Sequence, residues 1–224
     1  GYRWDDFNTY LYKTTDYGTN WESIRGNLPN EVANVIVQDP VNPSILYTGL
    51  DFGSYVSFDD GNEWHYLANM PNVASYDMIV HPHDLELVIG THGRSIWVMD
   101  VKPLHKVAGR LGEAITAFKP NDIRASNRWG ESRAEWREST MPEVELLYFI
   151  NTKKEQTEVV IDVLDKDGNK ITSITTNGSS GFNTFTWNLV VEKKEDGFTF
   201  LQKGNYTLEF KNGATSHEVE FEVK

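Results

Sequence analysis

Three polar residues in the first half of the chain are of types that contact ligands. His92 and Arg94 flank Gly93, which can adopt backbone conformations that other residues avoid, and Asp51 lies in an earlier loop. An imidazole, a guanidinium and a carboxylate can bind a polar ligand, and we expect a glycan or a protein. The structural alternative is that Arg94 pairs with a neighbouring acidic residue and His92 bonds a loop carbonyl.

Two short clusters suggest metal ligands, but neither has a full ligand set. His81 and His83 would lie on one side of a strand beside Asp84, yet no third ligand follows at zinc-binding spacing. The run 165–169 begins like a calcium loop, but its glycine is at the fourth place and no Glu is at the twelfth. We expect turns at both places, with no metal site and no cofactor.

The carboxylates do not predict a complete active site. A glycosidase needs two carboxylates about 5–9.5 Å apart. Asp51, Asp59 and Asp60 are available, but Asp59 belongs to a turn motif, and the sequence places no partner opposite Asp51. We therefore name no catalytic residue in this chain, and we leave open whether a larger parent protein is an enzyme.

The most specific pattern in the chain is [ST]-x-D-x-G-x-x-W, which occurs twice, 43 residues apart. The hydroxyl and carboxylate are expected to cap free backbone N–H groups, the glycine to take a positive φ, and the Trp to close the hairpin. A repeat of about 40–45 residues with several strands per unit predicts a propeller. The motif residues are Thr14, Asp16, Gly18 and Trp21 in the first copy and Ser57, Asp59, Gly61 and Trp64 in the second.

This pattern resembles the Asp-box, or BNR repeat, of sialidase-type, xyloglucanase-type and sortilin-type propellers. The Thr that often precedes the Trp is Asn20 in the first copy and Glu63 in the second. The segment 90–97 also resembles the closing strand of last blades in a group of bacterial secreted proteins described as glycosyl-hydrolase-like. The resemblance implies a bacterial protein that is secreted, periplasmic or on the cell surface.

The resemblance leaves three functions open. The chain could supply scaffold and carbohydrate binding to a glycosyl-hydrolase-like protein, recognise peptides or proteins as sortilin-like propellers do, or serve as a purely structural surface module. Because fold does not fix function, these alternatives stay open at this point.

Residues 1–100 hold only two repeats, whereas a closed propeller usually has 4–8 blades. We therefore expect the chain to be the C-terminal part of a larger protein, without a complete active site of its own. Two blade-like sheets would have uncovered edges, and exposed edges favour association with other strands. We expect self-association through these edges, or contact with a neighbouring domain.

The second half of the chain has a different pattern. Hydrophobic periodicity is lost over residues 101–142, which we predict to be a linker whose Trp129 and Trp136 dock on the adjoining domains rather than form a sugar-stacking platform. Residues 143–224 alternate between apolar and polar, most clearly at 218–223, with Gly-containing turns between the runs. This spacing predicts an immunoglobulin-like β-sandwich.

A second resemblance supports the sandwich. The segment 181–188, followed by 204–207, resembles the G-x-N-x-x-x-W-[DN] … P-G-x-Y-T pattern of immunoglobulin-like modules related to the flagellar hook-capping protein, with Lys203 in place of the Pro. The chain is thus predicted to be all-β. It would comprise C-terminal blades of an incomplete β-propeller in 1–100, a linker in 101–142 and the sandwich in 143–224.

Composition excludes several classes of function. The 224 residues carry a net charge of −12, which disfavours binding to nucleic acid or to an anionic membrane. No hydrophobic run approaches the roughly 20 residues that cross a bilayer. The chain has no Cys, so it has neither a disulfide framework nor a catalytic thiol.

Overall fold

The computed structural model describes residues 4–67, 70–132, 139–194 and 197–224. Contacts divide the chain into two compact units, residues 1–111 and 112–224. The described residues form one short α-helix and many short strands, and every pairing between two named strands is antiparallel, which confirms the all-β prediction. No helix within the described ranges is long and apolar enough to cross a membrane.

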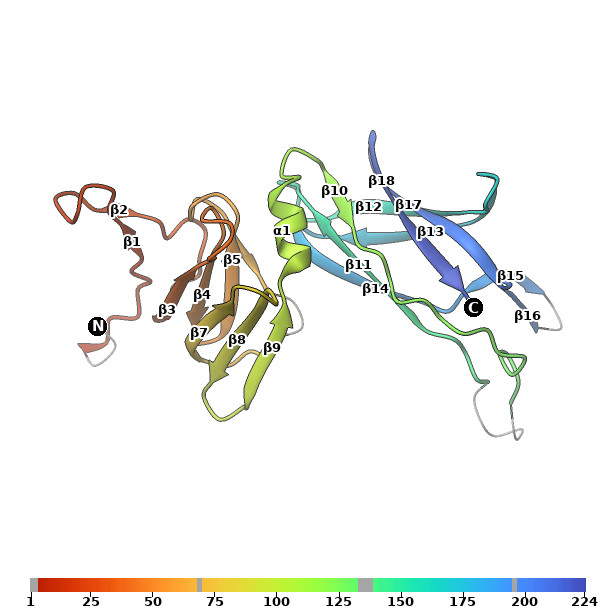
Figure 1. The fold of residues 1–224 in the computed structure, drawn as a ribbon, viewed down its shortest axis with the longest axis horizontal. Helices are drawn as coiled ribbons and strands as arrows, with labels where there is room; N and C mark the ends of the chain where they lie inside the picture. The colour runs from red at the N-terminus through yellow and green to blue at the C-terminus, as the bar shows by residue number, and fades with distance from the viewer. Residues whose placement is uncertain (1–3, 68–69, 133–138, 195–196) are drawn as a thin grey trace. The chain divides into compact units, whose positions relative to one another are not determined.

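The first unit contains three small antiparallel sheets and the helix (Figure 1). Strands β1 and β2 form a hairpin, β3 to β6 form a four-stranded sheet in chain order, and β7 to β9 form a three-stranded sheet in chain order. The bounds are β1 Tyr12–Lys13, β2 Glu22–Ser23, β3 Ala33–Gln38, β4 Leu46–Leu50, β5 Gly53–Ser57, β6 Trp64–Tyr66, β7 Ser75–His81, β8 Glu86–Thr91, β9 Ile96–Asp100 and α1 Lys102–Ala108.

In the four-stranded sheet each strand pairs with the strand that follows it in the sequence, in the order β3-β4-β5-β6. This is the strand order of a propeller blade. The second turn motif joins its last two strands, β5 and β6, and the first motif joins β1 and β2. In the described residues the first motif therefore belongs to a separate hairpin rather than to a four-stranded sheet. That these sheets are blades of a propeller stays a prediction.

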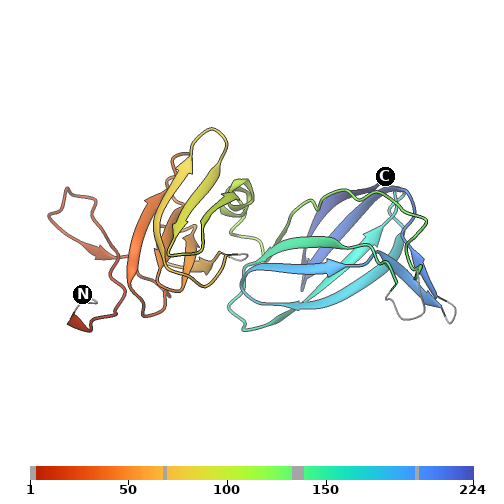
Figure 2. The ribbon, with the colours of Figure 1, turned by 90° about the horizontal axis from the view of Figure 1, so that it is seen from below.

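The second unit is a two-layer sandwich (Figures 1 and 2). One sheet has the order β10-β11-β14 and the other has the order β13-β12-β17-β18, and an extra hairpin pairs β15 with β16. The bounds are β10 Ile115–Ala117, β11 Val144–Ile150, β12 Thr157–Leu164, β13 Lys170–Gly178, β14 Gly181–Trp187, β15 Val190–Lys194, β16 Gly197–Phe200, β17 Gly204–Asn212 and β18 Thr215–Val223.

Alternate residues of both sheets fill one apolar core, as the period-2 pattern predicts. Leu146 and Tyr148 contribute from one sheet, and Ile161 and Phe210 contribute from the other. Near the start of β17 the hydroxyl of Tyr206 donates to the carbonyl of Gln202 at 2.8 Å, which is the bond of a tyrosine corner. The immunoglobulin-like layout follows from this strand order.

The segment 101–142 is not a linker throughout. It contains α1, which belongs to the first unit, and β10, which pairs with β11 in the sandwich. A seven-residue helix and a three-residue strand are too short to produce a hydrophobic period in the sequence. Trp129 packs against the sandwich core, with its ring 5.8 Å from that of Phe200, whereas Trp136 lies outside the described residues.

Candidate functional site

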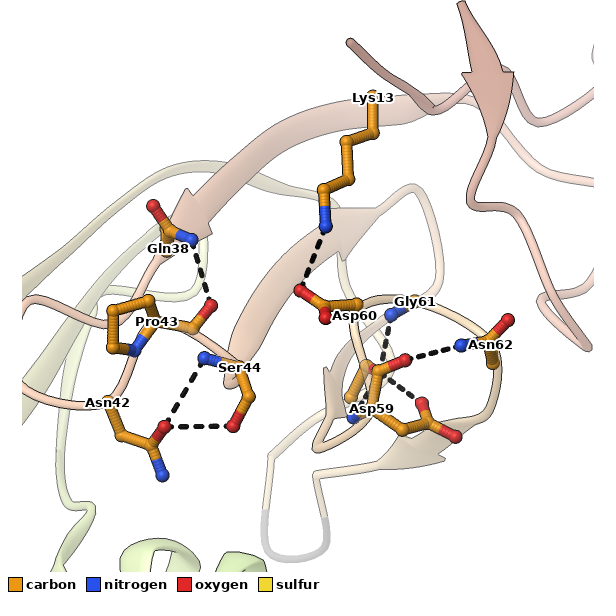
Figure 3. A network of polar contacts seen from close by, with 10 residues as sticks. Lys13, Gln38, Asn42, Pro43, Ser44, Asp59, Asp60, Gly61 and Asn62 are labelled. Atoms are coloured by element: carbon orange, nitrogen blue, oxygen red, sulfur yellow. Dashed lines mark hydrogen bonds and ion pairs between the residues drawn. The ribbon is translucent and has the colours of Figure 1, made fainter. Parts of the chain in front are cut away.

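The second turn motif is held by its own side chains (Figure 3). The hydroxyl of Ser57 accepts a hydrogen bond from the amide of Gly61 at 2.9 Å, and the carboxylate of Asp59 accepts one from the amide of Glu63 at 2.9 Å. Gly61 has a φ of 89°, a conformation that favours glycine. The Asp59 carboxylate is therefore used within the turn.

The first motif has the same set of bonds. The hydroxyl of Thr14 accepts from the amide of Gly18 at 2.8 Å, and the carboxylate of Asp16 accepts from the amide of Asn20 at 2.8 Å. Gly18 has a φ of 91°. Hydrogen bonds from the backbone and side chain of Asn20 hold the pKa of Asp16 below its ordinary value.

The two Trp residues of the motifs have different surroundings. Trp64 is 3% exposed, and its indole N–H donates to the carbonyl of Ile24, just after the first hairpin, at 2.9 Å. A Cβ on Gly61 would lie 2.7 Å from the Cβ of Ile24, so the second turn is pressed against the end of the first hairpin. Trp21, at the same motif position, is 62% exposed. The second turn motif and the end of the first hairpin thus pack together at Trp64, whereas Trp21 remains exposed to solvent.

Replacing Asp59 with Ala is expected to lower the free energy of unfolding of the first unit by about 1–2 kcal/mol, because the Glu63 amide loses its acceptor. Hydrogen exchange at the Glu63 amide, followed by NMR, should accelerate. The control is Asp60→Asn, which removes the surface ion pair with Lys13 but keeps a side chain that tolerates the positive φ of 61° at this position, and it should cost no more than about 1 kcal/mol. An unchanged exchange rate at Glu63 in the Asp59 variant would contradict this role.

The structure places His92 and Arg94 on the loop between β8 and β9, and Asp51 on the turn between β4 and β5. The ring of His92 packs edge-on against Tyr76, with centroids 5.5 Å apart. Asp51 accepts a hydrogen bond from the side chain of Asn34 at 3.0 Å. Both segments are tips of equivalent hairpins in the two sheets.

These three residues do not form one polar site by direct bonding. Among the described residues, no ion pair joins Arg94 to an acidic group and no hydrogen bond joins His92 or Arg94 to Asp51. The backbone carbonyl of Arg94 accepts a hydrogen bond from the indole N–H of Trp97 at 2.8 Å, so this bond within the loop uses the backbone of Arg94 and not its guanidinium group. Ligand contact by these side chains remains a prediction.

A groove of about 420 Å³ lies between the first hairpin and the four-stranded sheet. Its wall holds two half-exposed aromatic rings, Tyr12 and Trp21, together with the polar side chains of Lys13, Gln38 and Asp60. Aromatic faces beside hydrogen-bonding groups suit ligands that have both apolar and polar surface. The exposure of Trp21, which the motif alone does not predict, makes this groove the candidate binding site.

The polar side chains of the groove are positioned by short contacts (Figure 3). The ammonium group of Lys13 bonds one carboxylate oxygen of Asp60 at 3.0 Å. The amide nitrogen of Gln38 donates to the carbonyl of Pro43 at 2.8 Å. Because Asp60 follows Asp59 in the capped turn, the turn motif sets the position of one groove residue.

Sequence analysis missed a buried polar cluster around Asp39, which is 1% exposed. Its carboxylate accepts from the amides of Val41 and Asn42 at 2.8 and 2.9 Å, from the hydroxyl of Tyr47 at 3.0 Å, and contacts the imidazole of His105 at 2.9 Å. His105 lies on α1, 66 residues away in the chain. The cluster ties the helix to the β3–β4 loop, and no sequence spacing signals such a pair.

The Asp39 carboxylate is held in its charged form. Burial raises the pKa of Asp39, but the hydrogen bonds from Asn42, Val41, His105 and Tyr47 outweigh burial and hold the pKa below its ordinary value. Burial, with the nearby carboxylate, raises the pKa of Tyr47, so its hydroxyl stays protonated and can donate. Since the carboxylate is closed to solvent, we assign it an anchoring role rather than contact with a substrate.

Among the residues that the structure describes, neither predicted turn cluster is part of a group of three or more His, Cys, Asp or Glu residues that could hold a metal ion. His81 contacts Asp84 at 3.0 Å and lies 5.9 Å from the ring of His83. Asp165 accepts from the amides of Asp167 and Asn169 at 2.9 and 2.8 Å, which closes a hairpin turn.

No family model matches the chain, and no curated protein matches it. The solved structures that are similar to it include two from one bacterium. They are described as the extracellular domain of a one-component system and of a hybrid two-component system, both BT4673 from B. thetaiotaomicron, with identities of 10% and 11% and TM-scores of 0.33 and 0.29. The matches cover 96% and 92% of this chain, which spans only 28% and 27% of those structures.

Proposed function

We propose that this chain is a non-catalytic scaffold within a secreted, glycosyl-hydrolase-like propeller protein, located outside the cell, in the periplasm or on the cell surface. The observation that carries the proposal is the interlock between successive repeats, in which Trp64 bonds the carbonyl of Ile24 and Gly61 contacts the same residue. Repeats that stabilise their neighbours are the basis of stacked-repeat proteins.

The use of the carboxylates supports a non-catalytic role. Asp16 and Asp59 bond turn amides, and Asp39 is buried among its donors. Asp51 is bonded to Asn34. A glycosidase needs one carboxylate that donates a proton and a second that attacks or activates water, both open to the substrate.

A hydrolysis assay tests the scaffold function directly. The whole chain is incubated with plant, host and microbial glycans, and reducing ends are measured. We expect no turnover of any glycan. Turnover that is lost in Asp51→Asn would overturn the proposal, because it would place a working carboxylate in this chain.

The groove supports a second candidate function, which is binding of carbohydrate without cleavage. Sugar rings stack on exposed aromatic faces and bond polar groups at their edges, and Trp21 lies beside Lys13, Gln38 and Asp60 in this groove. Glycan binding would add a recognition role to the scaffold.

Replacing Trp21 with Ala is expected to weaken glycan binding by roughly 5- to 150-fold, because stacking of a ligand ring on an aromatic side chain is worth roughly 1–3 kcal/mol. Titration calorimetry with the glycans of the hydrolysis screen measures the effect. The matched control is Tyr17→Ala, which removes an exposed ring from the turn beside the groove. If the chain binds a glycan and Trp21→Ala binds it equally well, the groove is not the site; if it binds none, recognition of a protein becomes the better second candidate.

A further inference from the structure

A second groove, of about 360 Å³, lies within the sandwich unit, between residues 125–129 and residues 200–203. Its walls come from the segment before β11 and from the connection between β16 and β17. The volume is within the range of small-molecule sites, about 300–1,000 Å³. We call this cavity the sandwich groove, and neither the scaffold function nor the groove beside Trp21 makes use of it.

The first wall of the sandwich groove is held at both ends by main-chain hydrogen bonds. At one end the amide of Ala125 donates to the carbonyl of Lys224 at 2.8 Å. At the other end the amide of Gly130 donates to the carbonyl of Thr140 at 2.8 Å. The residues between these two bonds, which include Trp129, are therefore fixed on the sandwich.

The second wall is fixed in the same way. The amide of Leu201 donates to the carbonyl of Leu189 at 2.9 Å, and the hydroxyl of Tyr206 donates to the carbonyl of Gln202 at 2.8 Å. Because hydrogen bonds of the fold hold both walls, a ligand would not have to order them, and the entropy cost of binding is low.

Aromatic rings extend from the groove onto the β15–β16 hairpin. Trp129 and Phe200 line the groove with ring centroids 5.8 Å apart, and Phe200 lies 6.2 Å from Phe198, which is 41% exposed. Gly130 has a φ of 81°, and a Cβ there would lie 3.1 Å from the Phe200 ring. The three rings form one aromatic surface, which suits the apolar face of a sugar ring.

Two amide side chains line the same groove as these rings. The side-chain nitrogen of Gln202 donates to the carbonyl of Phe200 at 2.9 Å, which leaves the side-chain oxygen to accept from a ligand. Asn127 is exposed and also lines the groove. An amide offers both donors and acceptors, and a sugar hydroxyl is both donor and acceptor. These two side chains can therefore bond hydroxyl groups at the edge of a sugar ring.

Lys203 is the one charged residue among the described residues that line the sandwich groove. No ion pair joins its ammonium group to another described residue, whereas in the groove of the first unit Asp60 neutralises Lys13. A cation without a neighbouring carboxylate favours an anionic ligand. The net charge of −12 on the chain repels a polyanion, so a ligand with a single carboxylate fits best.

We propose that the sandwich groove binds a saccharide ring that carries one carboxylate, as a uronic acid residue does. The carboxylate is placed at Lys203, and ring hydroxyls are placed at Asn127 and Gln202. The apolar face of the ring packs on the aromatic surface. This site goes beyond the proposed scaffold function and depends neither on it nor on glycan binding beside Trp21.

NMR titration of the whole chain with methyl glucuronide and methyl glucoside tests the proposal, because these probes differ only in a carboxylate that replaces a hydroxymethyl group. We expect saturable shifts of the amides of residues 125–129 and 200–203, with a roughly millimolar Kd for the glucuronide. The glucoside should bind about two- to fivefold more weakly, as expected for loss of an exposed charge pair. Lys203→Gln should remove this difference between the probes.

Two further variants test the remaining contacts. Trp129→Ala should weaken binding of both probes by roughly 5- to 150-fold, but this ring also packs on the sandwich core. Asn127→Ala changes an exposed side chain and should weaken binding of both probes about two- to tenfold without a change in fold. The matched control is Lys166→Gln in a separate groove of the same unit, which should leave both affinities unchanged.

Three results would overturn the proposal. The first is no saturable shift in residues 125–129 or 200–203 up to about 50 mM glucuronide. The second is an unchanged preference for glucuronide in Lys203→Gln. The third is loss of glucuronide binding in Trp21→Ala, which would place the ligand in the groove of the first unit. Each of these results leaves the scaffold function untouched, because that function is tested by glycan hydrolysis.

Discussion

Replacing Trp64 with Ala is expected to lower the free energy of unfolding of the first unit by about 3–5 kcal/mol. Trp64 is almost fully buried in a cluster with Leu11, Ile24 and Leu46, and it also donates to the carbonyl of Ile24. The variant would leave a cavity and break the contact between the two turn motifs. Protection of the first hairpin should fall as well, because that hairpin packs on the lost side chain.

Trp21→Ala is the matched control, since it changes the same residue at the same motif position. Trp21 is exposed, so its removal should change stability by no more than about 0.5 kcal/mol. Denaturant unfolding followed by hydrogen exchange of peptides from residues 4–111 separates the first unit from the sandwich. Equal losses of stability in the two variants would contradict the difference in burial.

Replacing Asp39 with Ala is expected to destabilise the first unit by about 3–5 kcal/mol, because it leaves several buried donors without an acceptor. The carboxylate bonds two backbone amides and Tyr47, and it contacts His105 from α1. The helix should lose its protection from exchange in this variant. The same measurements apply as for Trp64.

The control for Asp39 is Asp84→Ala. Asp84 contacts His81 at 3.0 Å, but both side chains are largely exposed, so the loss should be no more than about 1 kcal/mol. If α1 stays protected when Asp39 is replaced, the carboxylate does not anchor the helix.

The effect of Asp39 should depend on pH in one direction. Because the folded-state pKa of this carboxyl is held below its ordinary value of 3.8, its contribution is present above that value and is lost as pH falls through the folded pKa. The difference in stability between the natural chain and Asp39→Ala should therefore narrow as pH is lowered below about 4. A difference that widens on acidification would contradict a charged Asp39.

The turns and strands followed closely from the sequence. Thr14 and Ser57 bond amides four residues ahead, and Asp16 and Asp59 do the same, so a short pattern of residue types specifies these turns. The alternation over residues 143–224 likewise predicted the two-layered sandwich, because each strand carries its own period of 2.

Three features depended on contacts that the sequence pattern does not contain. Helix α1 and strand β10, inside the predicted linker, are too short for a hydrophobic period and are held by partners elsewhere in their own units. The pairing of Asp39 with His105 joins residues 66 positions apart. The groove combines side chains from the first hairpin and the four-stranded sheet.

The two motif Trp residues show the limit of what the sequence alone predicts. The sequence by itself determined both turns, because their hydrogen bonds join residues only two to four positions apart and depend on local residue types. Only the tertiary structure decided that Trp64 is core and Trp21 is surface, because burial depends on what packs against a side chain. For Trp64 that neighbour is Ile24, 40 positions away, and for Trp21 the described chain supplies no equivalent cover.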